Sequence, residues 1–541
     1  MCTPMNVPTV AFACLLSIGL SGGSAWSQTL RIALSAEPTA VDPHYHNVTP
    51  NNALATHLFS SLVEQDEKQR LQPALAKTWE NDGRNRWTFK LRQGVSFSNG
   101  APFTADDVIF TFCRLQRNET KVTASFGRVT ANFASVTAVD DHTLAIETLQ
   151  PEPLLPNYLS DIAILSASIV PHGKITYDLG RECGVTGPWP VVGNFNDGTA
   201  AVGTGPYKLK SYVHGSAIDL ERNPTYWGEA EPWAAVQLLP VTSTGPRFAG
   251  LLAGDYDVIE NPAARDLGRI RNDKRFSYIV TPSARAIILQ LDVGREKSPA
   301  VKAADGRNPL QDVRVRKALS LAIDRDTIIK RLMDGSAEAA YQFMPVGMFG
   351  TLPNPAKLTY DPAASRKLLA EAGYPNGFQI TVATTNNRYV NDSQIVQAVA
   401  QYWAQIGVKT EVDAMPSTIY FPRRAKREFS VALAGFGSTS GETSQFLRVW
   451  AATPDEALAI GSANYGGYSS EVFDRLIREA IVTFDDDKRS QLLQKATVTL
   501  LDDMAFVPLH FESSIWAFKA DLAVTGRTDQ FTQAMSVKPK K

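Results

Sequence analysis

Residues 378–414 read FQITVATTNNRYVNDSQIVQAVAQYWAQIGVKTEVDA, and two periodicities follow one another within this stretch. FQITVAT (378–384) alternates apolar and polar residues, as a half-buried strand does. After the polar loop TNNRYVN, apolar residues recur at helical spacing, at Ile395, Ala398, Val399, Tyr402 and Ile406. Gly407 then ends the helix, and VKTEVDA alternates again. The stretch therefore predicts a strand, a loop, a helix and a second strand that runs parallel to the first.

The same order occurs twice more along the chain. TLRIAL (29–34) is followed by a polar loop and by the amphipathic segment NNALATHLFSSLVE (51–64). FSVALAG (429–435) is followed by GSTSG and its neighbours and then by the helical segment SQFLRVWA (444–451). Repeated strand–loop–helix units indicate an α/β protein, and we expect its sheets to be largely parallel.

Helix boundaries are marked in two further segments. In YDPAASRKLLAEAGYP, Asp361 suits the N-cap, Pro362 the first helical position and Gly373 the left-handed exit. VRVRKALSLAIDRDTIIKRLMDG (313–335) predicts another amphipathic helix that ends near Gly335.

Residues from about 70 to 200 differ from the rest of the chain in their pattern of apolar and turn-forming residues. Short strand-like runs, separated by turn residues, precede a long loop rich in glycine and proline; they are WTFKLR (87–92), VSFS (95–98), VTAVDD (136–141) and TLAIETL (143–149). This composition predicts a smaller subdomain that is rich in β-structure.

The N-terminal 27 residues resemble a secretory signal. They contain no Asp, Glu, Lys or Arg, and an apolar run, VPTVAFACLLSIGL (7–20), precedes small residues. We expect cleavage after Ser27 and export of the mature chain. The alternative is a retained membrane anchor, although fourteen apolar residues are short for a bilayer span of about 20 residues.

The length of the chain and its balance of charges limit the kinds of partner that we expect. The chain has 541 residues, with 54 Lys and Arg against 55 Asp and Glu. This length requires more than one domain. Because the charges balance, no basic field favours nucleic acid, and we expect none as a partner. Cys113 and Cys183 lie beyond the signal; they form a disulfide in an oxidising compartment or else remain two buried thiols.

Three strand-end loops are candidates for a ligand site, because open α/β sheets bind ligands beyond the carboxyl ends of their strands. The loops are residues 42–49, 384–391 and 436–443. The first contains His46 and Asn47. The second contains Arg388 beside Asn387 and Tyr389, a guanidinium fork among neutral hydrogen-bonding groups that suits a carboxylate; the alternative is a solvated loop arginine.

The third loop is rich in hydroxyl groups. Ser438, Thr439 and Ser440 both donate and accept hydrogen bonds, which suits a ligand with hydroxyl or amide groups. The carboxylate of Glu442 pairs with an ammonium group of the ligand or, alternatively, stabilises the N-terminus of the next helix.

Enzymatic interpretations find little support. GSTSG (437–441) is close to the G-x-S-x-G motif of α/β-hydrolases, with His510 downstream, but Thr439 occupies the position of the nucleophilic serine. His44, His46 and His57 lack the spacing of a zinc motif. Neither a G-x-x-x-x-G-K-[ST] nor a G-x-G-x-x-G sequence occurs. We therefore expect no enzymatic activity, no metal and no cofactor.

Several blocks of sequence, in order along the chain, resemble family 5 extracellular solute-binding proteins of bacterial ABC importers, which bind oligopeptides, dipeptides or nickel. The blocks are LQPALAKTWENDGRNRWTFKLRQGVSFSNGAPFTADDVIFTF (71–112), GTGPYKLKSY (203–212), LERNPTYWG (220–228), LQDVRVRKALSLAIDRDTI (310–328), YDPAASRKLLAEAGYPNGF (360–378) and DDMAFVPLHF (502–511).

The resemblance implies a two-lobed clamshell of the type II periplasmic-binding-protein class, with the β-rich subdomain as an addition. Lobe I is expected to comprise residues 28–285 and 509–541, and lobe II residues 286–508. The chain crosses between lobes near residues 284–292 and 506–514. The resemblance also implies that the exported chain is a periplasmic monomer that closes on its solute and then docks on a membrane permease.

At the site, the resemblance places Phe436 where peptide binders have a tryptophan and Thr439 where they have the aspartate that pairs with the ligand ammonium. Arg388 lies near the arginine that dipeptide binders direct at the ligand carboxylate. Two classes of solute remain. One is a short peptide or amino-acid derivative, with Glu442 as the ammonium partner. The other is an anionic or hydroxylated non-peptide solute, such as an opine, a sugar conjugate or an organic acid; a metal chelate is a further alternative.

Overall fold

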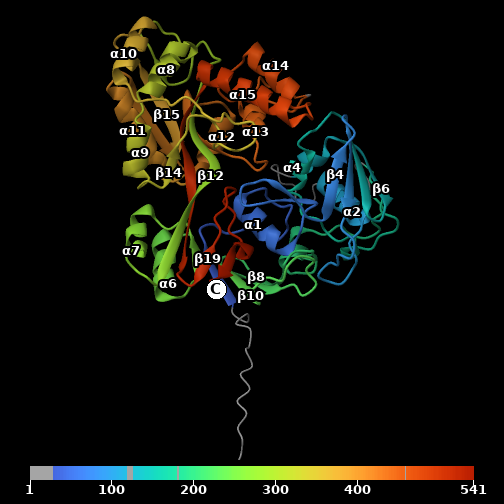
Figure 1. Cartoon of the computed structure of the whole chain (residues 1–541). Coiled ribbons are helices and arrows are strands. Elements are labelled where there is room, and N and C mark those ends of the chain that lie inside the picture. The colour runs from blue at the N-terminus through green and yellow to red at the C-terminus, as the bar shows by residue number, and fades with distance from the viewer. Residues whose placement is uncertain (1–28, 118–125, 179–181, 457, 541) are drawn as a thin grey trace, which may run out of the picture.

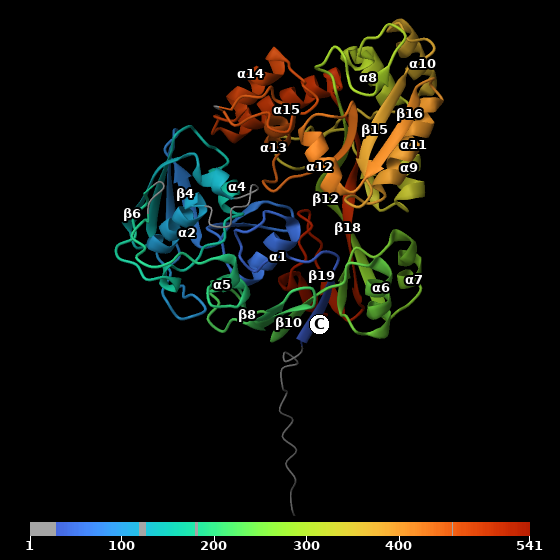
Figure 2. The ribbon, with the colours of Figure 1, turned by 180° about the vertical axis from the view of Figure 1, so that it is seen from behind.

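Two α/β lobes, joined by two long strands, make up the computed structural model, which describes residues 29–117, 126–178, 182–456 and 458–540. Figure 1 shows lobe II above and lobe I below, with the β-rich part of lobe I at one side, and Figure 2 shows the same arrangement from behind. The expected signal segment, residues 1–27, lies outside the described residues. Within the described part of the chain, no helix is long and apolar enough to cross a membrane.

The two connecting strands are β12 (Phe276–Leu291) and β18 (Phe506–Lys519), which pair with each other in antiparallel register. Their first contacts run from Phe276 opposite Lys519 to Pro282 opposite Ser513, and the register then shifts before Ala286 pairs with Phe511. On one side of this irregularity β18 pairs with β11 (Val258–Glu260) of lobe I, and on the other side β12 pairs with β17 (Val431–Gly437) of lobe II. The expected crossings, 284–292 and 506–514, overlap this region, and the exact lobe boundaries stay a prediction.

The central sheet has twelve strands and is mixed. Parallel pairing joins β1 (Thr29–Leu34) to β10 (Ala235–Pro240) and β11, and it joins β15 (Gln379–Thr385) to β16 (Lys409–Met415) and β17. The described pairs around β12 and β18 are antiparallel. The prediction of largely parallel sheets is therefore wrong for the region between the lobes. Strands that pass from one lobe to the other in opposite directions are necessarily antiparallel.

Lobe II encloses its part of the sheet between two apolar layers. Because side chains alternate across a strand, Ile287 and Leu289 of β12 face one core while Ala286 and Ile288 face the other. The lobe contains the following elements: β13 (Val301–Lys302), α8 (Val313–Leu321), α9 (Arg325–Leu332), β14 (Ala337–Ala339), α10 (Pro362–Glu371), β15 (Gln379–Thr385), α11 (Asp392–Ala404), β16 (Lys409–Met415), α12 (Ser417–Ala425), β17 (Val431–Gly437), α13 (Ser444–Phe446), α14 (Glu471–Ala480) and α15 (Asp486–Asp503).

The predicted start of one helix is confirmed, and two other predicted helical segments are divided in the structure. Asp361 accepts from the Ala364 amide at 2.8 Å and begins α10 as expected. The single helix predicted over 313–335 is wrong, because Asp324 accepts from the Thr327 amide at 2.9 Å and starts a separate helix, α9. The segment 51–64 also divides: α1 ends at Leu58, and residues 63–65 form strand β2, which pairs with β3.

Lobe I contains the start of the central sheet and a separate four-stranded antiparallel sheet, in the order β4–β5–β7–β6. Its elements are β1 (Thr29–Leu34), α1 (Thr49–Leu58), β2 (Val63–Gln65), β3 (Leu71–Pro73), β4 (Ala76–Asn81), β5 (Arg86–Leu91), α2 (Ala105–Arg117), α3 (Gly127–Thr130), β6 (Phe133–Asp140), β7 (Thr143–Thr148), α4 (Leu155–Leu159), α5 (Val192–Asn196), β8 (Tyr207–Val213), β9 (Ala217–Arg222), β10 (Ala235–Pro240), α6 (Thr244–Ala253), β11 (Val258–Glu260), α7 (Leu267–Arg271), β19 (Leu522–Val524) and β20 (Val537–Pro539).

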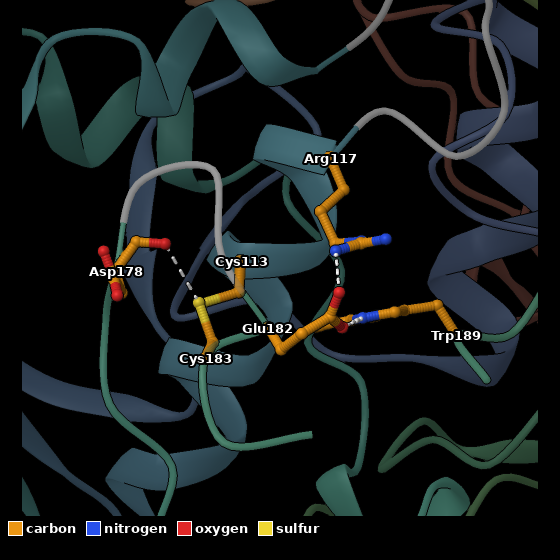
Figure 3. The surroundings of a disulfide bond; sticks show 6 residues. All are labelled: Cys113, Arg117, Asp178, Glu182, Cys183 and Trp189. Atoms are coloured by element: carbon orange, nitrogen blue, oxygen red, sulfur yellow. Dashed lines mark hydrogen bonds and ion pairs between the residues drawn. A yellow bond between two sulfur atoms is a disulfide. The ribbon is translucent and has the colours of Figure 1, made fainter. Parts of the chain in front are cut away.

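A disulfide joins Cys113 of α2 to Cys183, seventy residues further along the chain. The Glu182 carboxylate beside it accepts hydrogen bonds from Arg117 at 2.9 Å and from the Trp189 indole at 2.8 Å. Figure 3 shows these residues around the disulfide. The disulfide and these contacts attach the loop that follows the four-stranded sheet to the helix that covers it.

Candidate functional site

A cavity of about 370 Å³ lies between the lobes, within the usual size range of small-molecule sites. Its walls come from α1 and β2 of lobe I, from β12, from two strand-end loops of lobe II and from the C-terminal segment 527–535. The charged side chains among the lining residues are Glu64, Asp161, Glu231, Arg285, Arg388, Arg527 and Asp529.

Four of the ten ligand-binding candidates from the sequence line this cavity. They are Asn47, Arg388, Ser438 and Thr439. They come from the three strand-end loops that the sequence nominated, so the fold brings those loops to one place.

The other six candidates do not line it. His46 contacts the Thr39 hydroxyl at 2.8 Å, and Asn387 accepts from the Ser417 amide at 2.9 Å. The Ser440 hydroxyl lies 3.4 Å from Gln445 Oε1. Tyr389 and Phe436 serve the core instead: Tyr389 packs on lobe II strands, and Phe436 stacks edge-on against Phe446 and Trp450.

Glu442, the sixth, is buried beside α15. Its carboxylate lies 3.3 Å from the Arg489 guanidinium, and burial raises its pKa to about 7 against the opposing charge of Arg489. Because a protein cation already compensates this carboxylate and it does not face the cavity, Glu442 is not placed to pair with a ligand ammonium.

The loop of residues 437–443 is held from across the cleft by amide groups of lobe I. Gln65 Nε2 donates to the Thr439 carbonyl at 2.7 Å, Gln69 Nε2 to the Ser438 carbonyl at 2.8 Å and Asn157 Nδ2 to the Ser440 carbonyl at 2.8 Å. The two lobes are thus in direct contact beside the cavity.

One end of the cavity is positively charged. Arg285 projects from β12 and donates from Nε to Gln530 Oε1 at 2.9 Å, with the Glu512 carboxylate at 3.6 Å. Burial lowers the pKa of Arg285, Glu512 opposes this, and the nearby positive charge of Arg388 lowers it further. Glu512 lies near both guanidinium groups, whereas the nearby buried Asp392 carboxylate is bound by the Thr385 hydroxyl and by the backbone amides of residues 388 and 389. Guanidinium N–H groups therefore remain for an anionic group of a ligand.

Gly437 makes room for this arrangement. It pairs with Arg285 across β12 and β17, and a Cβ atom at residue 437 would lie only 3.1 Å from the Arg285 guanidinium. A larger residue would push the guanidinium away from this position.

The remaining charged groups of the cavity divide into paired and uncompensated carboxylates. Asp529 binds Arg527 at 2.6 Å, and Glu231 binds Lys538 at 2.6 Å. Burial raises the pKa of Glu64 to about 7, partly offset by Arg527 and Arg92. Burial also raises the pKa of Asp161 to about 7; the Thr439 hydroxyl, which donates to it, opposes the rise, and the negative charge of Asp529 adds to it.

Sequence reasoning missed Arg285, Asp161 and Glu64. A signal was present for Asp161, because it is the one charged residue in the otherwise apolar or small run YLSDIAILSASIV (158–170). Arg285 similarly interrupts the strand-like run from Ser283 to Leu291.

The side chains considered above for hydrolase and metal chemistry have other surroundings in the described ranges. No group of three or more His, Cys, Asp or Glu residues there is arranged to hold a metal ion. The Thr439 hydroxyl contacts Gln445 and Asp161, and the imidazole of His510 is buried on β18, where burial lowers its pKa to about 4. The site is built from groups that recognise charge and hydrogen bonds.

The two lobes, the crossing strands and the cleft between them define a binding protein of the clamshell type. The family model for bacterial extracellular solute-binding proteins, family 5, matches residues 70–457. The chain belongs to this family.

Relatives and solved structures agree with this assignment. The periplasmic oligopeptide-binding protein OppA of Salmonella typhimurium is 28% identical over 506 residues, which cover 90% of this chain and 87% of that protein. The dipeptide-binding protein of Escherichia coli is 27% identical over 517 residues, covering 90% and 91%. The structure of DppA from Helicobacter pylori in complex with the peptide STSA has a TM-score of 0.75 at 23% identity, covering 95% of this chain and 99% of that one, and shows the same fold.

Proposed function

We propose that this chain is the periplasmic solute-binding component of an ABC importer and that it captures a short peptide or an amino-acid-derived compound. Family membership supports the role in solute binding, and relatives named as oligopeptide- and dipeptide-binding proteins support the class of solute. An N-terminal signal that is cleaved after Ser27 would deliver the chain to the periplasm, where it would act as a monomer and pass its solute to a membrane permease.

The observation that carries the proposal is the arginine pair at one end of the cavity. Arg285 and Arg388 face the same cavity, and one buried carboxylate, Glu512, lies near both. A ligand carboxylate would accept hydrogen bonds from the guanidinium N–H groups that remain. Charge-assisted hydrogen bonds of this kind contribute about 1.5–3 kcal/mol each.

Capture would couple this contact to lobe closure. Arg388, Ser438 and Thr439 belong to lobe II, while Glu64 and Asp161 belong to lobe I. A solute that contacts both sets binds the closed form more tightly than the open form, so it shifts the population towards closure. No covalent bond is made or broken.

The test uses pooled random dipeptides and tripeptides with a free C-terminal carboxylate, and the same pools as C-terminal amides. Native mass spectrometry should detect complexes with the free acids, and calorimetry should show the amides binding at least tenfold more weakly. Arg388→Met should weaken binding of the acids by about 2 kcal/mol, the scale of one lost charge-assisted contact. Arg84→Met, at an exposed arginine between β4 and β5, is the matched control.

A second class of solute is favoured by one observation. The described lobe II loop that lines the cavity offers the hydroxyls of Ser438 and Thr439 and no carboxylate, which suits a hydroxylated non-peptide anion. If neither peptide pool binds, or if acids and amides bind equally, the peptide proposal fails. A hydroxylated anion recovered after denaturation of protein purified from its native host would then support this second class.

A further inference from the structure

Asp161 differs from the other acidic residues that line the cavity. It follows α4 in lobe I and lines the cavity, where it is partly buried and the surrounding protein atoms raise the pKa of its carboxyl group. Among the described residues it forms no ion pair, and the charged group that affects it most is another carboxylate, Asp529. The lining carboxylates of Asp529 and Glu231 are each paired with a protein cation, and Glu64, although it forms no ion pair within the described ranges, is near the positive charges of Arg527 and Arg92.

A partly buried carboxylate without a cation is unfavourable unless a partner arrives or the group takes up a proton. The Thr439 hydroxyl donates to Asp161 from the opposite lobe, which orients the carboxylate but does not neutralise it. The chain therefore leaves a negative charge uncompensated in lobe I, and it leaves guanidinium N–H groups of Arg285 and Arg388 for an anionic group.

We propose that Asp161 binds the ammonium group of the ligand, so that the cavity selects a zwitterion with its carboxylate at the two arginines and its ammonium at Asp161. This inference rests on the proposed function, because it names the ligand class for the same cavity. The cavity of about 370 Å³ lies at the small end of the range for ligand sites, which favours a short zwitterion over a long peptide.

Lobe closure completes the ammonium site. Thr439 belongs to the lobe II loop whose carbonyls accept hydrogen bonds from Gln65 and Gln69 of lobe I. The same closure places the Thr439 hydroxyl on Asp161. The ammonium site is therefore complete only in the closed form, in which an ammonium group would be shielded from water.

The experiment compares the dipeptide and tripeptide free-acid pools with the same pools after N-acetylation, which keeps the carboxylate and removes the ammonium. The wild-type protein should bind N-acetylated peptides at least tenfold more weakly than free ones. Asp161→Asn should weaken binding of free peptides at least tenfold and leave binding of acetylated peptides within threefold of wild type. Asp141→Asn, at an exposed carboxylate of the same lobe, is the matched control.

Proton release gives a second readout that a merely structural role would not change. The groups facing Asp161 are Asp529, which is paired with Arg527, and Thr439; Glu64 also lines the cavity. An arriving ammonium lowers the pKa of Asp161, so calorimetry at pH 7 in two buffers of different ionisation enthalpy should show proton release on binding. Asp161→Asn should lower that release, whereas residual release would come from Glu64.

The possible outcomes distinguish a failure of the ammonium site from a failure of the proposed function. If wild type binds free and acetylated peptides within twofold of each other, or if a folded Asp161→Asn variant keeps full affinity for free peptides, the ammonium site is overturned and the proposed function stands. If no peptide pool binds, both the ammonium site and the proposed function are contradicted. Circular dichroism melting of each variant establishes that it is folded before binding is measured.

Discussion

At the scale of single residues, the buried pair of Glu442 and Arg489 has a structural role. Their side chains are 4% and 9% exposed, and the charged groups lie 3.3 Å apart. Arg489 also contacts the ring of Phe349, with the guanidinium 4.6 Å from the ring centroid. This pair fixes the far side of the loop whose near side lines the cavity.

Arg489→Met should therefore destabilise the protein by about 3 kcal/mol at pH 8, because it leaves the Glu442 carboxylate buried without its cation. The loss should be smaller at pH 6. Without Arg489 the folded-state pKa of Glu442 lies further above its unfolded value, so stability that is present while the carboxyl is protonated is lost as the pH rises through that pKa. Urea unfolding at both pH values measures this.

Arg423→Met is the control for that measurement. Arg423 pairs with Asp413 and Glu428 at a partly exposed site, where such pairs contribute about 1 kcal/mol or less. Equal destabilisation of the two variants, or an Arg489→Met effect that is the same at pH 6 and pH 8, would contradict the assignment.

The sequence predicts which loops form the site better than it predicts which charged residues lie in it. Asn47, Arg388, Ser438 and Thr439 could be nominated because strand ends are visible in the alternation of apolar residues. Asp161 stands out as the one charged residue of the run 158–170, but its place in the site could not be predicted, because its position opposite Thr439 depends on how the two lobes pack. Glu442 was selected by proximity in sequence, but its side chain points to α15 rather than to the cavity.

At the scale of elements, the disulfide between α2 and the long loop is a crosslink between segments that are distant in sequence. Replacing both Cys113 and Cys183 by Ala should lower the free energy of unfolding by about 2–4 kcal/mol, because the unfolded chain regains the entropy of an open seventy-residue loop. Urea midpoints of wild type and variant give the difference.

Binding should be unaffected by the same change, since neither cysteine lines the cavity. Reduced wild type should unfold at the midpoint of the double variant. A midpoint unchanged by both reduction and substitution would show that the crosslink contributes nothing to the stability of lobe I.

Strands and helices were predictable where their determinants are local. The strand over 378–384, the helix over 392–406 and the cap at Asp361 correspond to β15, α11 and α10. Strand direction was not predictable at β12 and β18, because these partners are separated by more than two hundred residues. The break between α8 and α9 was encoded locally, by Asp324, but continuous apolar spacing concealed it.

At the scale of the whole molecule, the lobes are in contact through groups unrelated to the charges of the cavity. Gln65, Gln69 and Asn157 donate to carbonyls of lobe II, and Arg448 of lobe II lies 3.5 Å from Glu152 of lobe I. Each neutral hydrogen bond contributes about 1 kcal/mol net. Contacts between the lobes themselves therefore stabilise the closed form in addition to any contacts made by a solute.

Replacing Gln65, Gln69 and Asn157 together by Ala should shift the unliganded protein towards an open form. Loss of three interlobe hydrogen bonds weakens closure by up to about 3 kcal/mol. Since affinity falls with the fraction of binding-competent protein, peptide affinity should drop by roughly ten- to a hundredfold. Small-angle X-ray scattering should show a larger radius of gyration without ligand and a return to the wild-type value at saturating peptide acid.

The matched control is the triple change of Gln72, Gln93 and Gln150 to Ala, since these are exposed amide side chains of lobe I. It should leave both the radius of gyration and the affinity unchanged. If the interlobe variant keeps the wild-type radius and loses affinity, the three amides act on the loop that lines the cavity and not on closure. If the interlobe variant keeps both the wild-type radius of gyration and the wild-type affinity, closure depends on the remaining interlobe contacts. The ion pair of Arg448 with Glu152 would then be the next contact to replace.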